Sequence, residues 1–237
     1  MIVFNGSLVS ASANTINWAT WDETEQDYSN AFIVDGKDAN NANAVGLGGG
    51  LALADRTWTQ NGTIDGNGTY RTLDGATEWF DGTTGFRDFL QGQSVYGIIF
   101  KLENWSSTSL ATLIRWTGLD NILIRRQETT KNLEVRAQNA AVGITADVPV
   151  DNAVLYVYFG CNGADARMGF TETTRPTKWS DFAATKRVSK GSAITLTAMN
   201  EADPEIFRDA SNSSRYVAVL FHYAVFAKET ALIDFNS

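Results

Sequence analysis

The sequence predicts an all-β fold, an antiparallel sandwich of two β-sheets. Residues 215–226 (RYVAVLFHYAVF) are apolar or aromatic on both alternating sides of a strand. Such a strand must be covered on both faces, and its β-branched and aromatic content favours a central strand over a buried helix. The chain of 237 residues also contains 20 glycines, and five Asn-Gly or Asp-Gly pairs between residues 61 and 82 supply turns that need positive φ. These pairs are Asn61-Gly62, Asp65-Gly66, Asn67-Gly68, Asp74-Gly75 and Asp81-Gly82.

The pattern of the central strand assigns its side chains to two faces. Strict alternation places one set on the first side of the strand and the intervening set on the second. The first set is Val217, Val219, Phe221, Tyr223 and Val225, and the second is Ala218, Leu220, His222, Ala224 and Phe226.

The first 50 residues are predicted to be an irregular N-terminal arm or extension, and residues 51–237 one sandwich domain. Short strands are expected at residues 2–4 and 15–21. Residues 22–43 are acidic and rich in Asn, so they are expected to form either a solvated loop or an arm that orders against a neighbour. Residues 46–51 (GLGGGL) are interpreted as a glycine-rich turn or hinge, because they lack the Gly-Lys-Ser/Thr ending of a phosphate-binding loop.

Strands recur from Leu51 onward at spacings that are typical of a sandwich. Residues 95–102 place Tyr96, Ile98, Phe100 and Leu102 on one face. Residues 110–116 and 121–127 are the next strands, and residues 128–131 are expected to be a hairpin loop. In residues 132–138, Leu133, Val135 and Ala137 are predicted to face the core, and Glu134, Arg136 and Gln138 to face water.

The C-terminal half is predicted to contain further strands and few helices. Residues 153–159 are apolar on both faces and end at Asn162-Gly163, a turn signal that residues 167–171 would follow as the returning strand. Residues 194–198 alternate again. Short helices are predicted at residues 84–90 and 203–208, the second with Pro204 in its first turn.

Charge, termini and cysteine usage exclude several function classes. The net charge of −8 is expected to repel nucleic acid. No apolar run reaches the roughly 20 residues of a membrane-spanning helix, and the N-terminus lacks the pattern of a secretory signal. The chain is therefore expected to be made in a cytosol, without nucleic-acid or membrane partners. Cys161 is the single cysteine and is interpreted as a small buried apolar side chain.

The order of these elements resembles a concanavalin A-like or laminin-G-like jelly roll. The resemblance lies in residues 70–80 (YRTLDGATEWF), in residues 95–102, in the approach from Val148-Pro149 to residues 155–159, and in residues 215–231. It covers residues 51–237 as a pattern rather than as an invariant motif. Residues 169–182 (GFTETTRPTKWSDF) are similar to tailed-bacteriophage structural proteins that carry this jelly roll.

The resemblance implies where catalytic acids would lie, and this sequence lacks the acidic residues that the glucanases of this fold have there. Glucanases of this fold carry their acids in a Glu-x-Asp-x-x-Glu-like run on one strand face. No such run occurs here, and Glu134, the nearest acidic strand position, is interpreted as a solvent-facing residue. The single histidine, His222, is interpreted as a satisfied core residue, because it lies in the most apolar strand. The chain is therefore expected not to be an enzyme, and no catalytic residue or cofactor is predicted.

Two routes to a ligand remain in the sequence, calcium and exposed aromatic rings. Asp65, Asn67, Asp74 and Asp81 could supply oxygen ligands for calcium, but the same residues serve tight turns, so no metal is predicted. Four aromatic residues in loop-like segments could stack on a sugar or could close an end of the sandwich. They are Trp58, Tyr70, Trp105 and Trp179, and none is assigned as a ligand-binding residue.

These observations support three hypotheses about function. The first is a non-enzymatic structural protein of a tailed-phage virion, in capsid decoration or in the tail, whose partners are other virion proteins and further copies of this chain. The second is a carbohydrate-binding adhesion module that binds a surface glycan. The third is a glycoside hydrolase or lyase whose acids lie outside the familiar run.

Overall fold

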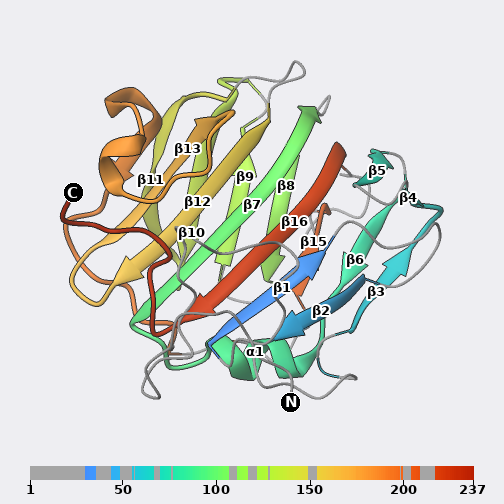
Figure 1. Cartoon of the computed structure of the whole chain (residues 1–237), viewed down its shortest axis with the longest axis horizontal. Coiled ribbons are helices and arrows are strands. Elements are labelled where there is room, and N and C mark those ends of the chain that lie inside the picture. Colours follow the sequence, from blue (N-terminus) through green and yellow to red (C-terminus); the bar gives the residue numbers. More distant parts are fainter. Residues whose placement is uncertain are drawn as a thin grey trace, which may run out of the picture.

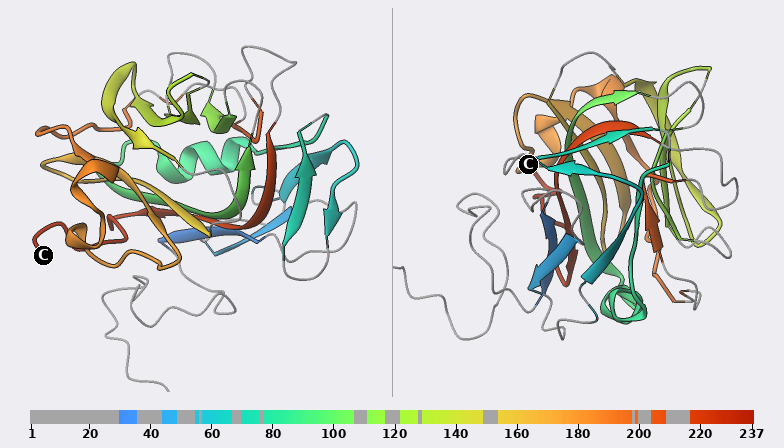
Figure 2. Two further views of the ribbon diagram at one scale, coloured as in Figure 1. Left: turned by 90° about the horizontal axis from the view of Figure 1, so that it is seen from above. Right: turned by 90° about the vertical axis from the view of Figure 1, so that its right-hand side faces the viewer.

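The structure, a computed structural model, confirms the predicted all-β class: an antiparallel two-sheet sandwich of the jelly-roll type (Figures 1 and 2). It describes residues 30–35, 44–48, 55, 57–66, 70–75, 77–106, 111–116, 122–127, 129–148, 154–197, 199, 204–208 and 217–237. No helix in these ranges is long and apolar enough to cross a membrane.

Sheet 1 forms the front layer in Figure 1, and its strands lie in the order β14-β13-β12-β7-β16-β1-β2. Their bounds are β14 Arg187–Ser189, β13 Ala166–Glu172, β12 Leu155–Asn162, β7 Val95–Ser106, β16 Ala218–Lys228, β1 Ala31–Asp35 and β2 Ala44–Gly48. The short hairpin of β4 (Asp65–Gly66) and β5 (Arg71–Asp74) joins this sheet where β5 pairs with the first half of β16.

Sheet 2 packs behind sheet 1, and its strands lie in the order β11-β10-β9-β8-β15-β6-β3. Their bounds are β11 Ala140–Asp147, β10 Asn132–Ala137, β9 Ile122–Arg126, β8 Ala111–Trp116, β15 Pro204–Ile206, β6 Trp79–Asp81 and β3 Thr57–Asn61. Seen from above in Figure 2, the yellow-green strands of sheet 2 and the green and red strands of sheet 1 form two layers. Two residue pairs, Ala44 with Trp58 and Val45 with Thr57, link β2 of the first sheet to β3 of the second.

The core lies between the two sheets, and helix α1 (Thr84–Leu90) closes one end of it (Figure 2). The helix has the predicted bounds, and its apolar side chains Phe86, Phe89 and Leu90 are buried. Phe86 packs edge-on against Trp58 and Phe226, with ring centroids 5.1 and 4.6 Å away. Aromatic pairs in this geometry add to the free energy gained from apolar burial.

Strand β16 is a central strand covered on both faces, as predicted, but its alternation is broken at His222. Leu102 of β7 pairs with Phe221, and the next β7 residue, Lys101, pairs with Tyr223, so His222 is the extra residue of a β-bulge. The same residue marks the change of neighbour from β5, which ends its pairing at Phe221, to β1, which begins at Tyr223.

The predicted assignment of faces is therefore wrong beyond Phe221. Phe221 lies in the core between the sheets, whereas Tyr223 and Val225 lie in a second apolar cluster on the outer face of sheet 1. Ala224 and Phe226 return to the inter-sheet core. A single inserted residue reverses every later side chain because the strand period is two.

The N-terminal region contributes two strands to the sheets. Residues 31–35, expected in a loop or arm, form β1 along β16, and residues 44–48, which include part of the predicted glycine hinge, form β2 along β1. The strands predicted at residues 2–4 and 15–21 lie outside the described residues.

The other predicted strands at residues 95–102, 110–116, 121–127, 132–138, 153–159 and 167–171 are confirmed within one to four residues at their ends. Two predictions are wrong. Residues 204–206 form β15 instead of a helix, because they pair on both sides, with β6 and with β8. Residues 194–197 form no strand, although Ile194 and Leu196 are buried and Leu196 exchanges two backbone hydrogen bonds with Gly92 and Gln93.

Candidate functional site

The outer face of sheet 2 carries the candidate site. Cross-strand pairing places one row of outward side chains across all seven strands of the sheet. The row reads Thr59, Asp81, Glu205, Arg115, Leu123, Arg136 and Ala141. A neighbouring row reads Thr112, Arg125, Glu134 and Ile144 across β8 to β11. Asp81 and Glu205 lie in the β6–β15 half of this face, where Arg208 pairs with Glu205. Arg115, Arg125 and Arg136 lie in the β8–β10 half.

Glu134 organises the arginine half. Its Oε2 accepts hydrogen bonds from Nε and Nη2 of Arg125, both at 2.8 Å, and from Nε2 of Gln127 at 3.0 Å. Its Oε1 accepts a hydrogen bond from Nε of Arg136 at 2.8 Å. A carboxylate that accepts several charge-assisted bonds fixes the planes of both guanidinium groups.

The predicted solvent-facing role of Glu134 is therefore wrong. The side chain points outward from the sheet, as alternation requires, but only 5% of it is exposed because Arg125 and Arg136 lie across it. Burial alone would raise the pKa of Glu134, but the hydrogen bonds from Gln127 and Arg125 and the positive charges of the arginines outweigh burial and lower the pKa.

Solvent reaches the arginines on this face. The exposed fraction is 42% for the Arg136 side chain and 19% for that of Arg125. Ile144 lies opposite Glu134 on β11, and 50% of it is exposed. Among the residues that the structure describes, it is the large hydrophobic residue that solvent reaches most. Trp79, two residues before Asp81 on the same face, is half-buried and donates a hydrogen bond from Nε1 to Asp81 Oδ1 at 2.9 Å.

This face therefore combines fixed guanidinium donors with the exposed Ile144, while Arg208 lies over the ring of Trp79 at 4.2 Å. The sequence offered neither Arg125 nor Arg136 as a candidate, since register between adjacent strands is what brings them together with Glu134. Binding sites for sugars need polar groups in fixed positions beside apolar surface. The arrangement can hydrogen bond to and pack against a polyhydroxylated ligand.

Two of the four aromatic candidates are core residues. Trp58 on β3 is 1% exposed and Trp105 on β7 is fully buried, so neither can stack on a sugar. Tyr70 is half-buried beside His222, with ring centroids 5.4 Å apart. These positions fit the alternative that aromatic residues serve the sandwich itself.

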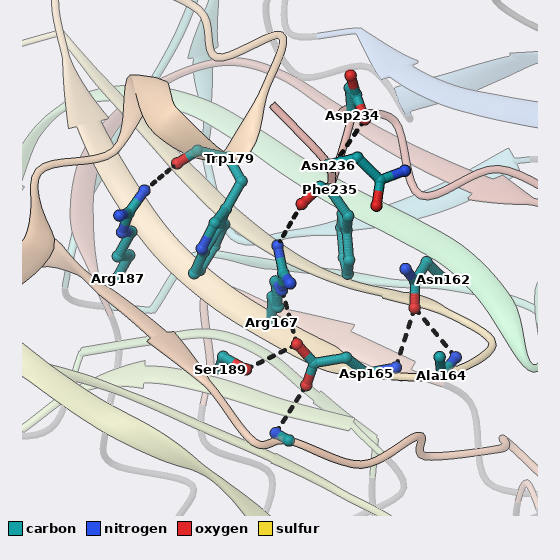
Figure 3. A network of polar contacts seen from close by, with 11 residues as sticks. Asn162, Ala164, Asp165, Arg167, Trp179, Arg187, Ser189, Asp234, Phe235 and Asn236 are labelled. Carbon is teal, nitrogen blue, oxygen red and sulfur yellow. Dashed lines mark hydrogen bonds and ion pairs between the residues drawn. The ribbon is translucent and has the colours of Figure 1, made fainter.

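Trp179, the fourth candidate, has both ring faces occupied. Figure 3 shows Arg187, Trp179, Arg167 and Phe235 stacked in that order. The guanidinium carbons of Arg187 and Arg167 lie 5.1 and 4.8 Å from the Trp179 ring, and that of Arg167 lies 4.5 Å from the Phe235 ring. Arg167 also donates hydrogen bonds to Asp165 Oδ2 at 2.6 Å and to the Phe235 carbonyl at 2.8 Å. The column anchors the C-terminal residues on the outer face of sheet 1 and leaves no open indole face for a ligand.

His222 and Cys161 have the structural roles that the sequence predicts. His222 is nearly buried, and its Nε2 lies 2.8 Å from Glu103 Oε1. Cys161 is a free, buried cysteine in the inter-sheet core.

The calcium candidates are spread over separate strands. Asp65 lies on β4, Asp74 on β5 and Asp81 on β6. Asp81 accepts hydrogen bonds from Asn61 and Trp79. Asn67 lies outside the described residues. Within the described ranges, no group of three or more His, Cys, Asp or Glu residues is arranged to hold a metal ion.

A pocket of about 380 Å³ lies between the end of β13 and the segment that follows Trp179. Its lining includes Phe170, Glu172, Asp181 and Lys186. Lys186 forms an ion pair with Glu172, and Asp181 accepts hydrogen bonds from the backbone of Thr177 and Lys178. Because its charged groups serve the protein's own contacts, this pocket is a weaker candidate than the outer face of sheet 2.

Comparison with known proteins gives the fold and no family. No protein-family model matches the sequence, and no match was found among curated proteins. Among solved structures, Trypanosoma rangeli sialidase in complex with sialic acid is similar, with a TM-score of 0.52 and 7% identity over 83% of this chain and 30% of that chain. The metal-free exoplasmic/lumenal domain of VIP36 has a TM-score of 0.43 and 7% identity, over 88% of this chain and 96% of that chain. The chain spans about 30% of the length of the sialidase it matches, and the likeness concerns the fold alone.

Proposed function

We propose that this chain is a non-catalytic carbohydrate-binding module whose ligand lies on the outer face of sheet 2. The observation that carries the proposal is the fixed pair of guanidinium groups, Arg125 and Arg136, held on either side of Glu134 beside the exposed Ile144. Orienting these donors before the ligand arrives reduces the entropy cost of binding. A lectin-like sandwich with such a face supports the module hypothesis over an enzyme.

A glycan array tests this proposal. The wild-type chain is expected to bind at least one glycan, and R125A/R136A is expected to bind it at least tenfold more weakly, which is about 1.4 kcal/mol. The matched control is R87A, which removes a partly buried arginine on α1 at the end of the sandwich. No binding by the wild type, or equal binding by wild type and R125A/R136A, contradicts the proposal.

The absence of catalysis is part of the proposal and has its own test. Incubation of the wild-type chain with a panel of polysaccharides is expected to release no reducing ends and no unsaturated products. Turnover of any member of the panel would favour the hydrolase or lyase hypothesis instead.

We further propose that the module belongs to a tailed-phage virion, where it contacts other virion proteins and further copies of itself. Support comes from the resemblance of residues 169–182 to phage structural proteins. In the structure this segment runs from β13 through the Trp179 column that anchors the C-terminus.

Assembly is tested by light scattering on the full chain and on a chain that starts at Asn30, which keeps β1 and β2 in sheet 1. The full chain is expected to be an oligomer and to bind virions that lack it, and the shortened chain tests whether residues 1–29 mediate the contact. A monomeric full chain that does not bind such particles contradicts the virion proposal and leaves the glycan proposal standing.

A further inference from the structure

The arginine patch, defined as Arg115, Arg125 and Arg136, concentrates positive charge in a chain of net charge −8. The three residues come from the adjacent strands β8, β9 and β10 and point to the same side of sheet 2. Because neighbouring strands lie about 4.8 Å apart, the backbones of Arg115 and Arg136, on either side of β9, are about 10 Å apart. That span is comparable to one or two sugar rings.

Glu134 lies within the arginine patch and pairs with both Arg125 and Arg136. Arg115 lies in register with Glu205, which also pairs with Arg208. Acidic groups elsewhere on the molecule act weakly here, because charges more than about 8 Å apart are screened at physiological ionic strength. The local field, rather than the net charge, decides which ligand this face attracts.

The geometry of Arg125 suits a carboxylate. Its Nε–H and one Nη2–H are directed to Glu134 Oε2, which leaves three of the five guanidinium N–H groups outside that ion pair. A planar guanidinium binds carboxylates through two parallel hydrogen bonds, which an ammonium group cannot reproduce. Glu134 acts as a positioning residue, since it fixes the plane in which those donors lie.

We propose that the arginine patch binds the carboxylate of an acidic sugar, such as a uronic or sialic acid, and that Glu134 orients Arg125 and Arg136 for it. The inference rests on the proposed glycan-binding function and names the ligand class. Asp81 and the Glu205–Arg208 ion pair occupy the other half of the same row, so the carboxylate of Asp81 disfavours the carboxylate of the sugar at that end.

Paired ligands test the inference. Oligosaccharides of galacturonate and sialylated oligosaccharides are compared with their methyl esters, which keep the sugar ring and remove the charge, and with neutral glycans. At least tenfold tighter binding of a free acid than of its ester supports the inference. Equal binding of acid and ester, or binding of neutral glycans alone, overturns the inference while carbohydrate binding stands. Binding of no glycan at all contradicts the proposed function itself.

Two variants separate orientation from charge. R125K keeps the charge and loses the planar donor pair, and it is expected to bind the free acid at least fivefold more weakly. E134Q makes the patch more positive but weakens its hold on both guanidinium groups, so binding is expected to fall. If charge alone attracted the ligand, E134Q would bind more tightly and R125K would bind as the wild type does, and either result would overturn the role of Glu134. R87K is the matched control, and unfolding curves confirm that each variant is folded.

Discussion

Glu134 shows how a single carboxylate can be both outward-facing and buried. Two arginines and one glutamine cover it, and their hydrogen bonds lower its pKa despite burial. A carboxyl group whose pKa is lower in the folded protein contributes stability above its unfolded value of about 4.5, and that contribution is lost as the pH falls through the lowered folded pKa.

E134Q is therefore expected to reduce the free energy of unfolding by about 1–3 kcal/mol at pH 7, because it leaves the arginines without their charged acceptor. Urea unfolding of both proteins at pH 7 and at pH 3 measures the difference. The difference between wild type and variant should shrink at pH 3, and an equal difference at both pH values would mean that the charge of Glu134 does not stabilise the fold.

The pKa of Glu78 is shifted in the opposite direction from that of Glu134. Burial is the main cause that raises its pKa from 4.5 to about 7, and the nearby Asp74 and Asp65 add to it, although the backbone N–H of Asp74 donates a hydrogen bond to Glu78 Oε2 at 2.5 Å. The folded protein therefore holds this proton more tightly than the unfolded chain does, and stability falls as the pH rises from 4.5 to 7.

E78Q removes that titration. Between pH 4.5 and pH 8 the free energy of unfolding of the wild type is expected to fall, relative to that of the variant, by on the order of 1–2 kcal/mol after allowance for solvent screening. Denaturant midpoints at pH 4.5, 6 and 8 give the comparison. Parallel pH profiles for the two proteins would show that Glu78 ionises normally.

Among the elements, the C-terminal segment after β16 depends on one residue of β13. Arg167 lies between the rings of Trp179 and Phe235 and hydrogen bonds to the Phe235 carbonyl (Figure 3). Beneath this segment, Tyr158 donates a hydrogen bond to the Ala231 carbonyl at 2.9 Å. The segment covers the second apolar cluster on sheet 1, so its attachment protects that face from water.

R167A is expected to weaken this attachment and to leave the inter-sheet core intact. Carboxypeptidase should trim the variant at least several-fold faster than the wild type, because the terminal residues separate from the sheet more often. R87A serves as the control for loss of an arginine. Unchanged trimming would show that the apolar contacts of Leu232, Ile233 and Phe235 hold the segment without Arg167.

The sequence predicts an element well where the pattern of apolar and polar residues within that element is enough to identify it. Strand β7 alternates cleanly from Tyr96 to Leu102, most of strand β16 is apolar, and helix α1 has its apolar residues on one side. Strand β15 was missed because three residues beginning with Pro204 form a strand only by pairing with β6 and β8, which are distant in the sequence. The bulge at His222 was missed because a change of neighbouring strand leaves no mark on the alternation of residue types.

The candidate site was not predictable for the same reason. Alternation correctly places Glu134 and Arg136 on the outer side of β10, but the burial of Glu134 depends on Arg125 from the next strand. Of the aromatic residues that the sequence offered as sugar platforms, Trp58 and Trp105 are in the core, since their segments are strands rather than loops.

For the whole molecule, the two sheets differ in what covers their outer faces. Sheet 1 has its second apolar cluster under the C-terminal segment. Sheet 2 presents arginines, acidic groups and Ile144 outward. The outer face of sheet 1 therefore packs against the C-terminal segment, and in our proposal the outer face of sheet 2 binds the ligand.

The position of the ligand can be measured by an NMR titration of the arginine Nε–H signals with a glycan that the wild type binds. If the glycan lies on the outer face of sheet 2, the signals of Arg125 and Arg136 shift as the glycan is added, and the fitted dissociation constant equals that of glycan binding. The signal of Arg87 on α1 then stays unchanged. Shifts confined to Arg167 and Arg187 of the Trp179 column, with Arg125 and Arg136 unchanged, would place the ligand on sheet 1 and contradict the proposed site.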